Sequence, residues 1–522
     1  MPDPKCRQIS LIFAAAAWLF LVSPAIARGQ TTTKTTAAAG TAEQRAARAY
    51  DAARASPLEL EVFLRRMPKG SDLHYHLVGG IYAETFIRDA AEDGLCVELA
   101  SHAFAAPQPN CGAGQVAAAE AFSNQDLYDA LVDAFSMRSF VPTTGTNGHD
   151  RFFETFGKFG GISKRHAGEW LDEIVSRAAG QNEQYLEIME TPPFGHAAQI
   201  AAQIGWREDL GQLRDELLAR GLRDEVALAR AERDQAEASR RSREHCGTPE
   251  EMPSCKVMVR YIYQILRGYP KEQVFAQTLL GFETASADPR FVGINYVMPE
   301  DGTISMADYA LHMKIVGFLH GLYPKIHISL HAGELAPGLV PPEGLCCHIR
   351  LAVEEAHAER IGHGVDVMHE DRPYDLLKEM AARHVMVEIN LTSNDGILGV
   401  SGKEHPLPIY RKYHVPVSLS TDDEGVSRSN MTHEYVRAAE TYALSYADLK
   451  QMVRTGLEHT FLPGASLWRE PDVFTGTAAA CTGDATANVK PSPACSNFLD
   501  SSEKAKQQWE LERRFHEFEA SF

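Results

Sequence analysis

Eight short apolar runs, separated by longer segments, constrain the fold of this chain more than any other feature. The runs are SDLHYHL, QYLEIME, KVMVRYIY, FVGINYVM, IHISLHAGE, ERIGHGV, VMVEINLT and VPVSLSTDD. Segments with helical spacing lie between most of them, for example residues 271–284, 306–322 and 374–383. Eight strands alternating with helices predict an α/β fold, a (β/α)8 TIM barrel. A doubly wound open sheet is the alternative. It is disfavoured because no glycine-rich dinucleotide turn follows the first run.

The first 27 residues have the layout of a secretory signal peptide. Lys5 and Arg7 precede an apolar run, and Ala25–Ala27 place small residues where a signal peptidase reads them. An uncleaved membrane anchor is the alternative, but the run is short for a spanning helix. We therefore expect residues 1–27 to be removed and the protein to be periplasmic or secreted.

The rest of the chain divides by composition and by the spacing of its strands. Residues 28–57 are expected to form a leader and the start of an N-terminal helical extension, and residues 58–522 a single barrel domain. Three stretches longer than the repeat needs predict inserted helices and loops near residues 92–148, 196–250 and 469–497. The second contains RDEVALARAERDQAEASRRSREH, which predicts a helix with a solvated, charged face.

Charge and cysteine content narrow the classes of partner and compartment. The formal net charge of -19 argues against a nucleic-acid partner and suits a protein that meets small molecules. No later segment is apolar enough to span a membrane, so no membrane partner is expected after cleavage; a homodimer is left open. Of nine cysteines, Cys6 would leave with the signal peptide. An even number in an oxidising compartment permits disulfides.

Three cysteine pairs lie close together in the sequence. They are Cys96 with Cys111, Cys246 with Cys255, and Cys481 with Cys495. Each would close a short loop outside the eight strands, so we expect these local disulfides. The neighbouring Cys346 and Cys347 are not expected to bond each other, because a disulfide between adjacent residues is strained.

Side chains suited to metal binding and proton transfer stand at the C-terminal ends of the predicted strands. In a closed barrel these ends converge on the face where active sites form. The first run carries two histidines two residues apart, which project from the same face of a strand. Three imidazoles and a carboxylate suit a catalytic zinc, which keeps one position open for water. The predicted zinc ligands are His74, His76, His331 and Asp422. The residues left for proton transfer are Glu334, His363 and Asp423.

Each of these motifs has an ordinary structural explanation when taken alone. A His-x-His pair in a strand is often incidental, TDD is a common turn or helix cap, and HAGE suits a strand followed by a glycine turn. Their occurrence together, in order and each at a strand end, favours a shared catalytic site.

Five longer motifs make the chain recognisable. MPKGSDLHYHLVGG, SLHAGE, RIGHG, HPLPIYRKYHVPVSLSTDD and GLEHTFLPG closely resemble the adenosine deaminase family of the amidohydrolase superfamily. The leader and MPKGSDLH look most like its secreted branch, the adenosine deaminase-related growth factors, and their bacterial relatives. The resemblance covers roughly residues 58–464 and the final helix. It implies one zinc per chain and hydrolytic deamination of adenosine or 2'-deoxyadenosine to inosine and ammonia.

The resemblance also implies a role for each residue of the site. The four predicted ligands match the zinc ligands of the family. Glu334 matches the residue that protonates the purine ring nitrogen, His363 the residue that orients the attacking hydroxide, and Asp423 its hydrogen-bond acceptor. DRFFETFGKF resembles the helix that lies over the nucleoside. Its Phe152 and Phe156, with Phe153, would cover the base or merely pack that helix, and both readings stay open.

Three positions depart from the family pattern. Val78 stands where many members have an acidic residue that meets the ribose. Met298 stands where many have a glycine whose backbone meets the purine, and it is predicted to contact substrate. Ser420 replaces a frequent asparagine.

A deaminase or amidohydrolase for another purine-like substrate is therefore the alternative. The alternative from a different class is an extracellular binding or signalling protein with the same fold. It is disfavoured because a protein that only binds a partner does not need Glu334.

Overall fold

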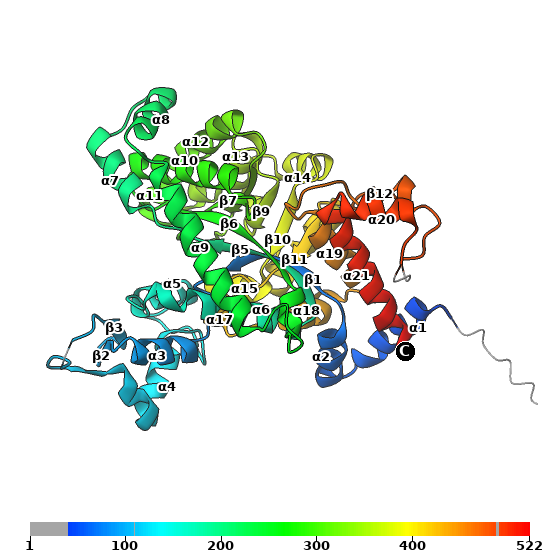
Figure 1. Ribbon diagram of the computed structural model, residues 1–522, viewed down its shortest axis with the longest axis horizontal. Helices are drawn as coiled ribbons and strands as arrows, with labels where there is room; N and C mark the ends of the chain where they lie inside the picture. Colours follow the sequence, from blue (N-terminus) through cyan, green and yellow to red (C-terminus); the bar gives the residue numbers. More distant parts are fainter. Residues whose placement is uncertain (1–39, 109, 487–489) are drawn as a thin grey trace, which may run out of the picture. The chain divides into compact units, whose positions relative to one another are not determined.

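The eight apolar runs all form strands, and these build one parallel sheet. The computed structural model describes residues 40–108, 110–486 and 490–522, and within them the order of the sheet is β1-β5-β6-β7-β8-β9-β10-β11. The strands are β1 (Gly70–His76), β5 (Glu183–Glu190), β6 (Met258–Leu266), β7 (Phe291–Val297), β8 (His327–Ala332), β9 (Arg360–His363), β10 (Met386–Ile389) and β11 (Val417–Leu419). Neighbouring strands are parallel, and helices surround them (Figure 1). The predicted (β/α)8 barrel is confirmed.

The barrel closes between β11 and β1 without a regular ladder. An isolated parallel bridge joins Tyr75 to Asp422 just beyond the end of β11. The backbone N–H of Asp422 donates to the carbonyl of His74 at 2.9 Å. The hydroxyl of Thr421 donates to the Asp72 carboxylate at 2.6 Å. A few specific contacts therefore hold this seam, in place of a run of ladder hydrogen bonds.

The helices that pack around the sheet follow the predicted spacing closely. They include α6 (Ala167–Gly180), α10 (Lys271–Ala287), α11 (Thr303–Ala307), α12 (Tyr309–Leu322), α13 (His348–Glu354), α14 (Pro373–Ala382), α15 (Leu391–Leu398), α16 (Leu407–Lys412), α17 (Glu424–Ser427), α18 (Met431–Tyr442) and α19 (Tyr446–Glu458). The helix expected over residues 306–322 forms as α11 and α12. None of the described helices is both long enough and apolar enough to cross a membrane.

The predicted N-terminal helical extension consists of two helices. These are α1 (Ala42–Ala53) and α2 (Pro57–Arg66). Ser56 caps α2 by accepting from the backbone N–H of Glu59 at 3.4 Å. Because a residue before proline avoids helical torsion angles, Ser56 and Pro57 end one helix and begin the next. The C-terminal helix α21 (Glu503–Ala520) packs against α1, as Figure 1 shows.

The remaining elements lie in the stretches predicted as insertions or next to them. They are α3 (Ala83–Glu92), β2 (Cys96–Glu98), β3 (Ala103–Ala105), β4 (Gln115–Ala117), α4 (Gln125–Ala134), α5 (Gly148–Lys158), α7 (Gly195–Ile204), α8 (Leu210–Ala219), α9 (Asp224–Arg243), β12 (Trp468–Glu470), β13 (Thr475–Thr477) and α20 (Pro493–Asp500). Residues 42–522 form one compact unit. The predicted signal peptide and residues 28–39 of the predicted leader segment lie outside the described residues.

All three predicted local disulfides form. They join Cys96 to Cys111, Cys246 to Cys255, and Cys481 to Cys495. The structure also joins Cys346 to Cys347, against our expectation.

Helix α9 is less exposed than its charged sequence predicts. Its apolar Val226, Ala229 and Ala236 are buried, and so are Arg233 and Arg240. These arginines are tolerated inside the protein because each forms an ion pair with a glutamate. The helix packs against α6 and therefore presents one face to the interior.

Candidate active site

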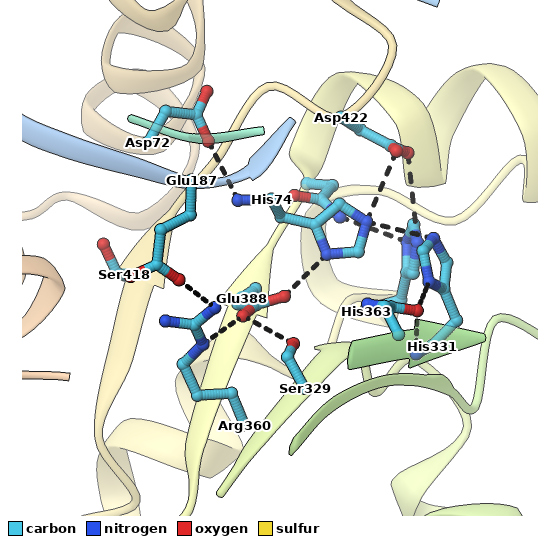
Figure 2. A network of polar contacts seen from close by, with 12 residues as sticks. Asp72, His74, Glu187, Ser329, His331, Arg360, His363, Glu388, Ser418 and Asp422 are labelled. Atoms are coloured by element: carbon cyan, nitrogen blue, oxygen red, sulfur yellow. Dashed lines mark hydrogen bonds and ion pairs between the residues drawn. The ribbon is translucent and has the colours of Figure 1, made fainter. Parts of the chain in front are cut away.

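Three imidazole nitrogens and one carboxylate oxygen meet at the C-terminal end of the barrel (Figure 2). The Nε2 atom of His331 lies 3.1 Å from that of His74 and 3.2 Å from that of His76. Oδ1 of Asp422 lies 3.4 Å and 3.2 Å from the same two nitrogens of His74 and His76. All four residues are buried. Nitrogen lone pairs this close repel one another unless a cation or a proton lies between them, so the donor set fits a zinc ion.

Each histidine is turned toward this point by a hydrogen bond from its other ring nitrogen. The acceptors are Glu388 for His74 at 2.6 Å, Gln264 for His76 at 2.7 Å and Asn295 for His331 at 2.7 Å. A bond to Nδ1 fixes the tautomer and leaves the Nε2 lone pair free for a metal. Our sequence reasoning missed these three residues. Each of the three is a polar residue within an otherwise apolar strand, and this pattern could have identified them in the sequence.

The carboxylate that holds His74 belongs to a buried ionic network, drawn in Figure 2. Glu388 lies 2.7 Å from Nε of Arg360 and accepts from the Ser329 hydroxyl at 3.0 Å. Arg360 in turn donates to Glu187 at 2.6 Å. Burial would raise the pKa of Glu388, but the Arg360 guanidinium holds it below its ordinary value. The carboxylate therefore stays charged beside His74.

The electrostatics of the site favour a positive charge among the four candidate ligands. Burial alone would lower the pKa of His74, yet its contacts with Asp422 and Glu388 raise it to about 10. Burial would raise the pKa of Asp422, but His74 and His76 hold it well below its ordinary value. Both shifts have the direction that a cation-binding site requires.

Glu334 follows β8, and its carboxylate lies within 4.8 Å of side-chain atoms of His363 and Asp422. The backbone N–H groups of Gly333 and Glu334 donate to the Glu300 carboxylate at 3.0 Å and 2.9 Å. Burial raises the pKa of Glu334 well above its ordinary value, and the nearby Asp422 adds to this effect. Glu334 is therefore suited to hold a proton at neutral pH, and Glu300 fixes the loop that carries it.

His363, at the end of β9, presents its Nε2 atom to the same space. The side-chain amide of Asn394 donates to Nδ1 of His363 at 2.9 Å, so the ring carries its proton on Nε2. Nε2 lies 3.8 Å from Glu334 and 3.9 Å from Asp422. Burial lowers the pKa of His363 to about 3. The ring therefore stays neutral and can donate a hydrogen bond into the site.

Two residues of the site, His363 and Asp422, have unusual backbone torsion angles. A glycine leaves the space that the side chain of Asp423 occupies. His363 has a φ of 69° and Asp422 a φ of 61°, values that are uncommon for non-glycine residues and often mark functional sites. A Cβ atom at Gly79 would overlap the carboxylate of Asp423. Burial raises the pKa of Asp423 to about 8. The close approach of Gly79 thus holds Asp423 beside the ligand Asp422.

A cavity of about 760 Å³ opens above these groups. Its wall includes Phe152 and Phe156 of α5, together with Met298 after β7, so all three predicted substrate-binding residues face it. Met298 has a φ of 90°, and its sulfur accepts from the backbone N–H of Gly268 at 3.3 Å. Val78 also lines the cavity and is 41% exposed.

Comparison with known proteins agrees with this arrangement. A family model described as adenosine deaminase matches residues 173–467. An adenosine deaminase of Clostridium perfringens is 33% identical over 135 residues, 26% of this chain and 37% of that protein. One of Escherichia coli is 39% identical over 137 residues, 26% of this chain and 38% of that protein. The matched segments thus span little more than a third of the length of these relatives.

A solved structure provides a comparison of folds. An amidohydrolase from Burkholderia ambifaria with bound zinc superposes with a TM-score of 0.52 at 16% identity. The superposition covers 77% of this chain and 88% of that one. At this identity the likeness shows the shared barrel fold alone.

Proposed function

Because the chain belongs to the adenosine deaminase family of the amidohydrolase superfamily, we propose that it is a zinc-dependent deaminase of adenosine or 2'-deoxyadenosine. The products would be inosine, or its 2'-deoxy form, and ammonia. The observation that carries the proposal is the convergence of three Nε2 atoms and the Asp422 carboxylate in a space that Glu334 and His363 also reach. Metal ligands alone would not need a buried acid poised to give up a proton.

The donor set fits one zinc per chain, held by His74, His76, His331 and Asp422. When bound, zinc supplies a water molecule acidic enough to attack at neutral pH. The remaining chemistry belongs to side chains of this chain. Asp423, next to Asp422, accepts a hydrogen bond from the attacking water and directs it.

Glu334, His363 and the cavity would complete the reaction. Glu334 gives its proton to the purine ring nitrogen beside C6, so that this carbon accepts the oxygen of water. His363 donates from Nε2 and stabilises the negative charge that develops on that oxygen. The C6–N bond then breaks. One of the two water protons completes the ammonia that leaves, and the other restores the carboxyl proton of Glu334. The aromatic side chains of α5 cover the base and exclude solvent.

Another purine-like substrate is the second candidate within the same reaction type. Val78 and Met298 support it, because both line the cavity and both replace residues that meet the nucleoside in many members of the family. A substrate with a different sugar or ring substituent would meet apolar groups at these two positions.

We also propose a periplasmic or secreted location, and with it the resemblance to the secreted branch of the family. Four disulfides among the described residues support this, because disulfides persist in oxidising compartments. The mass of the mature chain tests the location. Cleavage after Ala27 would support it, and an intact Met1 would contradict it.

The reaction is tested with the purified, zinc-loaded mature chain. Adenosine should lose its amino group, seen as the ultraviolet change from amino to oxo purine together with stoichiometric ammonia. A chelator should abolish the change and added zinc should restore it. Absence of ammonia release from a fully zinc-loaded chain, across a panel of 6-aminopurines, would refute the proposal.

A further inference from the structure

Helix α9 forms one wall of the cavity above the candidate metal centre. The helix belongs to the stretch predicted as an insertion between β5 and β6, and it packs against α6 and α10 (Figure 1). Its cavity-lining residues are Ala229, Glu232, Arg233, Gln235, Ala236 and Ser239. Most are three or four positions apart and so lie on one face of the helix. This stretch therefore contributes directly to the space that a substrate would occupy.

A buried ion pair joins this wall to the barrel. Arg233 is 4% exposed, and Glu190, the last residue of β5, is 8% exposed. Nε of Arg233 donates to Oε1 of Glu190 at 3.0 Å, and Nη2 contacts Oε2. The guanidinium also lies 4.1 Å from the centre of the Tyr261 ring. This two-point contact fixes the orientation of the Glu190 carboxylate, and both residues of the pair line the cavity.

Glu190 is flanked in the chain by two residues that are connected to His76. Met189, its neighbour on β5, pairs with His76 on β1. On its other side, Thr191 accepts from the amide of Gln264 at 3.0 Å, and Gln264 accepts from His76 at 2.7 Å. Both residues that flank Glu190 are thus tied to His76. His76, His331 and Asp422 line the same cavity as Glu190, so a substrate bound at the metal centre shares this space with Glu190.

The Glu190–Arg233 ion pair can still form further hydrogen bonds, although its two charges neutralise each other. A carboxylate offers about four acceptor positions, and Arg233 uses two of those on Glu190. Among the described residues no other group bonds to this carboxylate, and Nη1 of Arg233 has no partner. The other two cations that line the cavity are also paired, Lys164 with Glu232 at 3.1 Å and Arg165 with Asp93 at 2.8 Å. Because each of these cations already has a carboxylate partner, the cavity suits a neutral hydroxyl better than a phosphate.

We propose that Glu190, held in place by Arg233, is a specificity-determining residue that accepts a hydrogen bond from a sugar hydroxyl of the substrate. The inference rests on the proposed function, which places the purine at Glu334. It assigns recognition of the sugar to β5 and to helix α9.

The test compares adenosine with its 2'-, 3'- and 5'-deoxy analogues, using kcat/KM on the zinc-loaded mature chain. Wild-type protein should prefer adenosine to at least one analogue by about tenfold or more, the effect of losing a hydrogen bond to a charged group. The double variant Glu190→Leu/Arg233→Met removes both partners, so neither charge is left buried and unpaired. In this variant the ratio of kcat/KM for adenosine to kcat/KM for the discriminated analogue should fall close to 1, and the zinc content should not change.

A matched control lies on the same helix. Arg240 pairs with Glu244 at 2.8 Å, both are buried, and neither lines the cavity. Glu244→Leu/Arg240→Met should keep the wild-type preference. If Glu190→Leu/Arg233→Met instead lowers kcat/KM equally for all four nucleosides, the pair only docks α9 and the inference is wrong. A wild-type protein without any preference would overturn it equally.

Binding separates this inference from the proposed reaction. Calorimetry with the same four nucleosides reports the sugar preference whether or not turnover occurs. A preference in binding that the double variant loses, without ammonia release, would refute the reaction and support the role of Glu190. Turnover of adenosine without a preference among the four nucleosides would support the reaction and refute the role of Glu190.

Discussion

Glu334 is the residue whose proposed role differs most from metal binding, so its replacement separates chemistry from structure. Glu334→Gln keeps the shape and a hydrogen-bond donor but cannot transfer a proton. We expect turnover of adenosine to fall by about 100- to 10,000-fold, the usual range for a lost general acid. Zinc content and melting temperature should stay close to wild type, because Glu300 still holds the loop through backbone N–H groups.

Three measurements on one preparation make this prediction decisive. Turnover, bound zinc and melting temperature should be recorded on the same sample of Glu334→Gln. Normal turnover with full zinc would reject the proton-donor role. A large fall in melting temperature with turnover per folded molecule intact would make Glu334 a structural residue of the turn after β8.

Glu388 allows a second prediction at this scale. It holds Nδ1 of His74 at 2.6 Å, and groups in this position commonly change metal affinity by about 10- to 100-fold. Glu388→Gln should therefore weaken zinc binding by about that factor, measured by competition with a chelator. Glu187→Gln is the control, because Glu187 is also buried and bonded to Arg360 but does not touch a histidine. Equal weakening in both variants would mean that the charge of the network, rather than the bond to His74, sets the affinity.

The groups that converge in the site could be predicted from sequence because strand ends of a barrel meet on one face. His74, His331 and Asp422 lie far apart in the sequence, yet the eight-strand pattern was enough to bring them together. The partners of the ligands could not be assigned in this way. Whether Glu388 or another polar strand residue faces His74 depends on the register between strands, which the sequence does not determine.

At the scale of elements, strands were predicted more reliably than the stretches between them. Continuous apolar runs that alternate with helical segments favour buried parallel strands, and all eight form. Helix α9 shows the limit of this reasoning. Its charge suggested a solvated surface, but Arg233 and Arg240 are buried because glutamates neutralise them. Charge composition describes exposure correctly only when the partner of each charge is also known.

For the whole molecule, the candidate metal centre spans the weakest part of the barrel. His74 and His76 belong to β1, whereas Asp422 follows β11, so a bound zinc would join the two sides of the closing seam. The seam otherwise depends on isolated contacts, including the backbone bonds from Asp422 to His74 at 2.9 Å and from His76 to Asp422 at 3.2 Å. A metal that binds only the closed barrel stabilises it in proportion to the logarithm of its free concentration over Kd.

Removing zinc should therefore loosen this seam before it affects the rest of the sheet. We expect the amide hydrogens of His76 and Asp422 to exchange about 10- to 1000-fold faster after chelation, since free zinc at 1,000 times Kd slows opening by about that upper factor. The ladder between β5 and β6, where Ile188 pairs with Tyr261, is the internal control and should change little. Uniform acceleration at both places would mean that zinc stabilises the barrel globally. No change at the seam would mean that Asp422 does not share a metal with His74 and His76, because a shared ion cannot leave without releasing both sides.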